Sequence, residues 1–172
     1  MKKARGFFLV MAIAMTIIAG LWVTMRTAKW VQFEINCTQY LKRAADANTV
    51  ETAKEELAKA IFYAEEKNLT EGVVSIFLHQ PKNDIGYWYQ NMVEAHSELE
   101  KISDEATALE KTNVLMKLRE TLTDDTESGT EVTIPNGISI YPNNVLYFWW
   151  GTLSWILCIV FWLIVDITRY KW

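Results

Sequence analysis

Two long apolar segments, one near each end of the chain, dominate its hydrophobic pattern. The first extends from Phe7 to Met25, and the second, from Val145 to Val165, contains no charged residue. A helix of about 20 apolar residues is long enough to cross the hydrocarbon core of a bilayer. The sequence therefore predicts two transmembrane helices, residues 7–25 and 145–165, that flank a more polar central region.

In the central region, apolar residues recur at steps of three and four, the spacing of one face of an α-helix. The first stripe continues directly from the first apolar segment and predicts that its helix extends to about Ala47. Thr49 then occupies a helix N-cap position, and a second stripe predicts a helix that ends near Asn68. The first stripe consists of Trp30, Phe33, Cys37, Tyr40 and Ala44, and the second of Val50, Ala53, Leu57, Ala60, Ile61 and Ala64.

The most regular pattern in the chain follows Asp84, another residue suited to an N-cap. Its apolar positions continue at steps of three and four from Ile85 to Leu109, and they predict one helix with a coiled-coil-like seam. The phase changes near Thr112 and Asn113. There the helix either shifts its face or gives way to a turn and a further helix.

Residues 123–144 differ in composition and are rich in Thr, Asp, Gly, Pro and Asn. We expect a linker here, mobile up to Thr130 and extended from there to the second span. The fold class expected for the chain is all-α. Two transmembrane helices flank an extracytoplasmic bundle of three or four helices within residues 26–122, and the linker joins this bundle to the second span.

Small side chains recur at steps of three and four within both predicted spans. Such spacing places them on one helix face, where a neighbouring helix can approach closely. We expect the two small faces to pack against each other, although small residues are common in membrane helices and a coincidental match is the alternative. The predicted pairs, level by level, are Gly20 with Gly151, Thr16 with Ser154, and Ala12 with Cys158.

Basic residues flank both spans on their terminal sides, in residues 1–6 and 166–172. Short flanks rich in Lys and Arg stay in the cytoplasm, so we expect both termini inside and the central domain outside, in a bacterial inner membrane. A cleaved signal peptide with a basic start is the alternative for the first apolar run. The whole chain has 17 Lys and Arg against 21 Asp and Glu, and this acidic balance argues against a nucleic-acid partner.

The sequence contains no recognisable pattern for catalysis or for cofactor or metal binding. His79 and His96 are too few, even with neighbouring carboxylates, to define a metal site. The serines lack a glycine-flanked elbow, and there is no glycine-rich phosphate loop. Cys37 and Cys158 lie in different regions, which excludes a disulfide scaffold. We therefore expect no catalytic, cofactor-binding or metal-binding residues, no cofactor, and a protein that is not an enzyme.

Aromatic residues at the start of the segment after Asp84 are candidates for recognition. Trp88 lies on the predicted seam and is expected in the core, whereas Tyr87 and Tyr89 lie off it and are candidate contacts for a partner or ligand. The preceding connection contains a short apolar piece that would return to the membrane surface if the first two helices run out and back. There it would either lie in the membrane interface or cover that end of the bundle. Its candidate partner contacts are Val73, Ile76 and Phe77.

The order of span, outer helical bundle and span resembles the sensing half of bacterial chemoreceptors, without a shared motif. Only residues 166–172 follow the second span in this sequence, so we expect any signal to pass through another membrane protein. The expected function is that of a non-enzymatic accessory or scaffold subunit. Its partners would be the lipid bilayer and either an integral membrane protein or further copies of the chain. A ligand sensor acting through a partner and a homo-oligomeric pore are the alternatives.

Overall fold

The computed structural model describes residues 2–103, 105–126 and 129–170. The chain is mostly helical and divides into two compact units. The first, which we call the helix pair, comprises the residues up to Trp30 and those from Asn143 onward. The second, the bundle unit, comprises Val31–Pro142.

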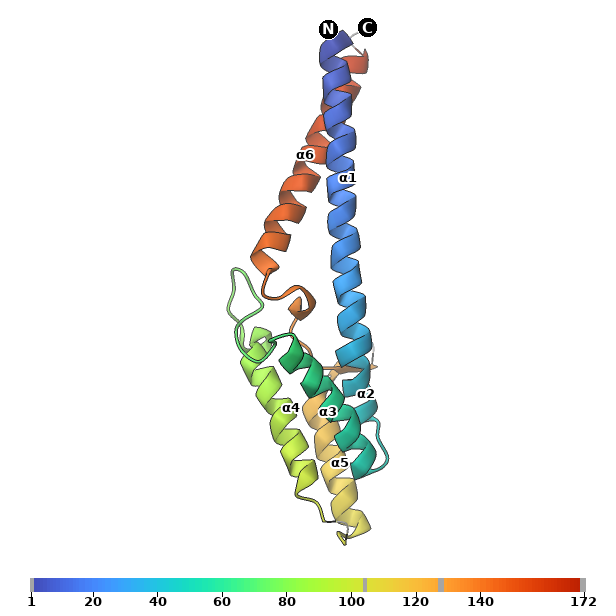
Figure 1. Ribbon diagram of the computed structural model, residues 1–172, viewed down its shortest axis with the longest axis vertical. Helices are drawn as coiled ribbons and strands as arrows, with labels where there is room; N and C mark the ends of the chain where they lie inside the picture. Colours follow the sequence, from blue (N-terminus) through green and yellow to red (C-terminus); the bar gives the residue numbers. More distant parts are fainter. Residues whose placement is uncertain (1, 104, 127–128, 171–172) are drawn as a thin grey trace. The chain divides into compact units, whose positions relative to one another are not determined.

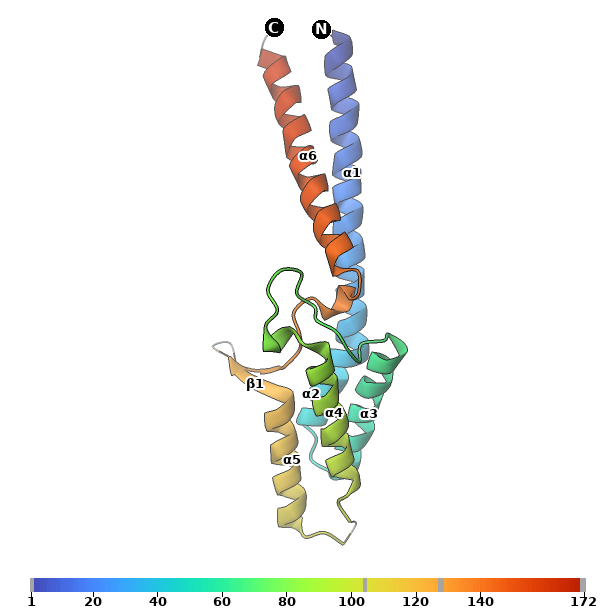
Figure 2. The ribbon, with the colours of Figure 1, turned by 90° about the vertical axis from the view of Figure 1, so that its left-hand side faces the viewer.

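The helix pair consists of the N-terminal part of α1 (Lys2–Phe33) and of α6 (Asn144–Tyr170). The two helices run antiparallel, and the labelled termini lie at the same end of the pair (Figures 1 and 2). Both helices are long enough and apolar enough to cross a membrane. The two long apolar helices predicted from the sequence are therefore confirmed.

The helix that begins as α1 continues far beyond the apolar segment. It passes through a π-helical turn, Glu34–Thr38, into α2 (Gln39–Ala45), so the backbone is helical from Lys2 to Ala45. No Gly or Pro occurs in the sequence from Leu21 to Ala45. Because these are the two residues that most disfavour a helix interior, nothing in the sequence ends the helix earlier. The predicted extension to about Ala47 is confirmed within two residues.

In the described part of the bundle unit, four α-helices form the bundle: α2, α3 (Val50–Glu66), α4 (Ile85–Glu100) and α5 (Ala108–Leu122). Contacts join α2 to α3, α3 to α4, α4 to α5, and α5 back to α2, so the four helices enclose one core. Figure 2 shows them side by side, with the α4–α5 connection at one end of the bundle and the α3–α4 loop at the other. The largest fully buried side chains are Leu41, Leu57, Ile85, Met92, Leu99 and Cys37.

Side-chain caps set where α3 and α4 begin. The hydroxyl of Thr49 accepts a hydrogen bond from the Thr52 backbone N–H at 3.2 Å, and the carboxylate of Asp84 accepts one from the Tyr87 N–H at 3.0 Å. Such caps satisfy backbone donors that have no partner within the helix. Both N-caps were predicted from the sequence, and both are confirmed.

The prediction of a single helix from Ile85 to Leu109 is wrong. Helix α4 ends at Glu100, and α5 begins at Ala108. Thr107 and Glu110 form a reciprocal capping box at the start of α5. The Thr107 side chain accepts from the Glu110 N–H while the Glu110 carboxylate accepts from the Thr107 N–H. This local arrangement favours a new helix start over continuation of the seam. Thr112 and Asn113, where the sequence suggested a break, lie inside α5.

The expected linker is largely structured and belongs to the bundle unit. Strands β1 (Thr123–Thr126) and β2 (Gly129–Val132) pair antiparallel directly after α5. The chain then passes through a short 3-10 turn, Ile138–Ile140, in which both isoleucines are buried. Thr123, Thr130 and Val132 are β-branched residues, which favour strands, and the expectation of a mobile segment up to Thr130 did not allow for them.

Candidate functional site

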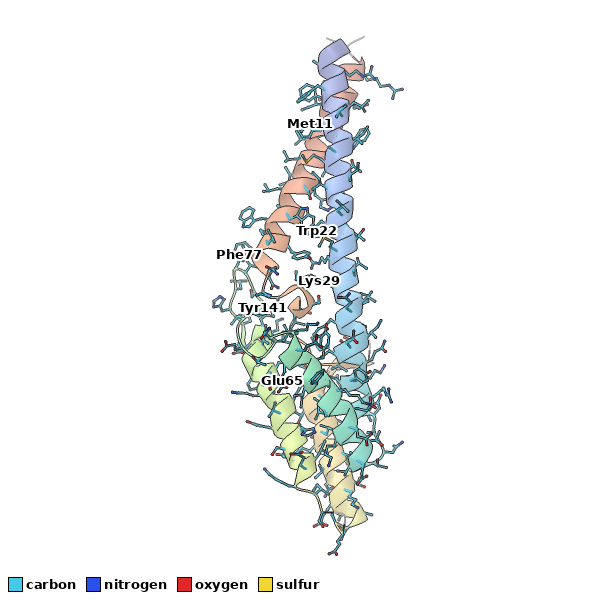
Figure 3. All side chains as sticks on the ribbon, viewed as in Figure 1. Met11, Trp22, Lys29, Glu65, Phe77 and Tyr141 are labelled. Atoms are coloured by element: carbon cyan, nitrogen blue, oxygen red, sulfur yellow. The ribbon has the colours of Figure 1, made fainter. Side chains whose placement is uncertain are left out.

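In the helix pair, Trp22 of α1 makes the main polar contact with α6. Its Nε1 donates a hydrogen bond to the backbone carbonyl of Tyr147 at 2.7 Å. The indole ring lies over Gly151, where an added Cβ would come within 2.6 Å of two ring carbons. Figure 3 shows Trp22 on α1 pointing toward α6. Gly151 therefore provides the space that the large Trp22 ring occupies.

A second polar contact in the helix pair centres on the hydroxyl of Thr16. It donates to the carbonyl of Ala12 at 2.8 Å and accepts a hydrogen bond from Trp162 Nε1 at 3.1 Å. The same oxygen lies 3.4 Å from the sulfur of Cys158. Hydrogen bonds between membrane helices contribute about 0.6–2 kcal/mol each. Thr16 therefore joins α1 to α6 through two side chains of α6.

The pairing of small residues differs from the predicted one. Thr16 lies against Cys158 rather than Ser154, and Gly151 lies against Trp22 rather than Gly20. A Cβ added at Gly20 would meet no described atom within 4 Å. Ala12, Ser154 and Cys158 are buried, as residues at the contact should be. The register shifts because the Trp22 ring, rather than a second small residue, fills the space beside Gly151.

A cavity of about 230 Å³ lies in the bundle unit between α4, α5 and residues 133–135. Trp88, Met92 and Leu122 form its apolar lining, and Lys82 and Asn91 add polar groups. Trp88 is held in place because its Nε1 donates to the carbonyl of Thr133 at 3.0 Å. Concave apolar sites with a few polar groups are typical of small-molecule binding. The sequence did not reveal this cavity, because α4, α5 and the segment after β2 form it together.

The two candidate tyrosines have different environments. Tyr87 is 64% exposed and lines the cavity on its outer side. Tyr89 instead packs partly against the core, and its hydroxyl donates to the carboxylate of Glu65 on α3 at 2.7 Å. Figure 3 labels Glu65 on the ribbon of α3. Tyr87 therefore remains available for a partner or ligand, whereas Tyr89 joins α4 to α3.

Replacing Tyr89 with Phe is expected to lower the free energy of unfolding at pH 7 by about 0.5–1.5 kcal/mol, the usual contribution of one hydrogen bond. The bond to Glu65, followed by partial burial, raises the pKa of the Tyr89 phenol above its ordinary value. The contribution is therefore fully present below the ordinary pKa of about 10 and is lost as the pH rises through the folded-state pKa. Unfolding curves of the two proteins between pH 7 and 11 would converge. A constant difference would contradict this assignment.

A buried carboxylate lies between α2 and α3. The Glu56 side chain is only 4% exposed, and its Oε1 pairs with Arg43 at 3.1 Å and with Lys59 at 2.8 Å. Its second oxygen, Oε2, is buried and has no hydrogen-bond partner among the described residues. Since a buried charge is costly unless it is compensated, the two cations stabilise a group that the core would otherwise disfavour.

Replacing both Arg43 and Lys59 with Met is expected to lower the free energy of unfolding by about 1–3 kcal/mol, because the Glu56 carboxylate then remains buried without a counter-charge. Chemical denaturation followed by circular dichroism measures this loss. Lys42→Met combined with Lys54→Met is the control, since it removes two cations from the same helices and leaves Glu56 paired. Equal effects of the two double variants would show that only net charge matters.

The remaining predicted contacts lie in the loop between α3 and α4. Val73 forms an isolated β-bridge with Asp84, and both Val73 and Ile76 are half-buried. Phe77 is largely exposed, like Leu78 beside it at the end of the same apolar piece. Val73 and Ile76 thus serve the packing of the loop itself, and the exposed apolar surface is at positions 77 and 78.

The metal-ligating side chains lie mostly apart from one another in the part of the chain that the structure describes. No group of three or more His, Cys, Asp or Glu side chains is positioned there to hold a metal ion. His96 Nδ1 lies 3.9 Å from an oxygen of Glu100, four residues later on α4. Cys37 and Cys158 are both buried and unpaired with each other.

Comparison of the chain with protein-family models, with curated proteins and with solved structures gave no match. Functional inference therefore rests on the geometry of the helix pair, the cavity and the α3–α4 loop.

Proposed function

We propose that the protein is a non-enzymatic two-span membrane protein that acts as an accessory or scaffold subunit of a larger membrane complex. The observation that carries this proposal is the outward surface of the helix pair. Although α1 and α6 contact each other, large apolar side chains such as Ile17, Leu21, Trp155 and Ile159 remain exposed. An apolar surface of this extent is stable only in lipid or against another membrane protein.

The proposed orientation has both termini in the cytoplasm and the bundle unit outside, in a bacterial inner membrane. The antiparallel helix pair supports a common side for the two termini. The basic residues of the two terminal flanks, 1–6 and 166–172, favour the cytoplasm as that side.

Tyr87 is the proposed contact with a protein partner outside the membrane. Aromatic residues are enriched where interfaces derive most of their binding energy. The test places a photo-crosslinking amino acid at position 87 of the tagged full chain in its native membrane. Phe62, which is 67% exposed on α3, is the matched control position. A partner captured from position 87 and not from position 62 supports the proposal, whereas identical or absent cross-links at both positions contradict this contact.

Purification in mild detergent, with mass identification of cross-linked chains, tests the subunit function itself. A defined complex with a different membrane protein at a fixed ratio is the expected result. A discrete assembly containing only this chain would favour a homo-oligomeric scaffold or pore. The structure offers little for a pore, because the Thr16 and Ser154 hydroxyls both bond within the helix pair.

Ligand sensing through a partner is the second candidate, and the cavity beside Trp88 favours it. Its volume of about 230 Å³ and apolar lining suit a small aromatic molecule. The test compares thermal unfolding of the full chain with and without indole or benzoate, the second of which could also meet Lys82. Stabilisation that is abolished by Met92→Trp, which fills the cavity, would support sensing. No shift with either probe would leave the subunit proposal as the better account.

A further inference from the structure

The α3–α4 loop, residues 67–84, has a closed neck and an apolar tip. At the neck, the Val74 N–H donates to the Asn83 carbonyl at 3.0 Å and the Ile85 N–H donates to the Gly72 carbonyl at 2.9 Å. At the tip, the Ser75 hydroxyl accepts from the Leu78 N–H at 3.1 Å, which shapes the turn. Phe77 and Leu78 are each 68% exposed. The backbone thus holds two large apolar side chains outward on a constrained loop.

Contacts within the bundle unit place this loop at the end where the chain joins α6. Gly72, at the loop neck, has a φ of +105° and lies directly against the phenol of Tyr141. Tyr141 immediately precedes the boundary of the unit at Pro142, after which α6 begins at Asn144. Since a residue spans at most about 3.6 Å of extended chain, the connection from Tyr141 to the first residue of α6 spans at most about 11 Å.

The other chain connection lies at the same end. The bundle unit begins at Val31, and Phe33 is its third residue. Its ring lies 6.0 Å from that of Tyr63, near the C-terminal end of α3, and 6.4 Å from that of Trp88, in the first turn of α4. The ends of α3 and α4 from which the loop emerges are therefore level with the continuation of α1 into the bundle.

The loop beyond its neck can extend about as far as the helical segment that separates Phe33 from the end of the apolar segment. About eight helical residues separate the end of the apolar segment, Met25, from Phe33, which corresponds to about 12 Å along a helix. Residues 75–82 form the part of the loop beyond the neck, and four residues out and four back can extend by about 13 Å. Figures 1 and 2 show the loop extending past the ends of α3 and α4, away from the α4–α5 connection.

We propose that Phe77 and Leu78 insert into the headgroup–acyl boundary of the bilayer, so that the loop holds the bundle unit on the membrane surface. His79, Gln80 and Lys82 follow the two apolar residues and would meet the polar headgroups. Apolar and aromatic side chains with basic neighbours are typical of segments that bind at this depth. The inference rests on the proposed two-span placement, because the bilayer must lie at the end of the bundle where α1 and α6 connect.

The experiment uses the full chain in vesicles of phosphatidylethanolamine and phosphatidylglycerol, with a nitroxide label on Leu78→Cys. Leu109→Cys is the matched control, because Leu109 is a leucine of the same exposure, 70%, at the far end of the bundle. Ile156→Cys reports the bilayer interior through the exposed face of α6. The unsubstituted protein, whose two cysteines are buried, checks that labelling is specific.

Collision of each label with oxygen, which concentrates in lipid, is compared with collision with a water-soluble nickel chelate. We expect oxygen to dominate at position 78 by several-fold and the nickel chelate to dominate at position 109. A label at position 78 that is as accessible to the nickel chelate as the label at position 109 overturns the inference. A label at position 78 that is immobile and shielded from both reagents by a protein partner also overturns it. If position 156 also reports water, the two-span proposal itself fails. If 156 reports lipid and 78 reports water, only the loop inference fails.

Discussion

Replacing Trp88 with Ala is expected to lower the free energy of unfolding of the bundle unit by about 3–5 kcal/mol, the usual cost of removing a large buried aromatic side chain. Trp88 is only 7% exposed, and its ring lies beside that of Phe33. Its Nε1 also donates to the Thr133 carbonyl, which joins α4 to the segment after the hairpin. The substitution therefore removes core volume and leaves a backbone acceptor without its donor.

Urea unfolding of the detergent-solubilised full chain, followed by circular dichroism, measures this loss. The control is Tyr87→Ala, which removes the neighbouring aromatic ring from an exposed position and is expected to change stability by no more than about 0.5 kcal/mol. Trp88→Phe should fall between the two, because it keeps an aromatic ring in the core and loses the bond to Thr133. Equal effects of the Trp88 and Tyr87 substitutions would contradict the four-helix core described above.

Replacing Gly151 with Leu is expected to disrupt the helix pair. Any Cβ at this position meets ring carbons of Trp22 at 2.6 Å, and the ring cannot move away without losing its hydrogen bond to Tyr147. Overpacking of this kind costs about 1–3 kcal/mol, which corresponds to about a 5- to 150-fold change in the population of paired helices.

Thr16→Cys provides the measurement, because position 16 lies against the native Cys158, with 3.4 Å between the two side-chain atoms. The rate of oxidant-driven disulfide formation between the two positions reports the pairing of α1 with α6. Gly151→Leu should slow this rate by at least about fivefold. Gly20→Leu is the control, since a Cβ there meets no described atom within 4 Å. If Gly20→Leu proves the more disruptive, the register predicted from the small residues is the correct one.

Local sequence was enough to predict the two long apolar helices, the continuous helix to Ala45 and the starts of α3 and α4. These features depend on local properties: hydrophobic length, the lack of Gly and Pro from Leu21 to Ala45, and caps at Thr49 and Asp84. Periodicity misled at the α4–α5 connection, because apolar spacing continued through a segment whose capping box starts a new helix. Periodicity records which face would be apolar if a helix formed, and it does not record whether the helix ends.

The pairing within the helix pair depends on the three-dimensional fit of side chains, and so do the cavity and the position of the α3–α4 loop. The Trp22 ring occupies the space beside Gly151, which spacing arguments had assigned to Gly20. The cavity needs side chains from α4, α5 and the segment after β2, and the loop is placed by Gly72 against Tyr141. Each of these features depends on the shapes of residues far apart in the chain, and a local pattern carries no information about that fit.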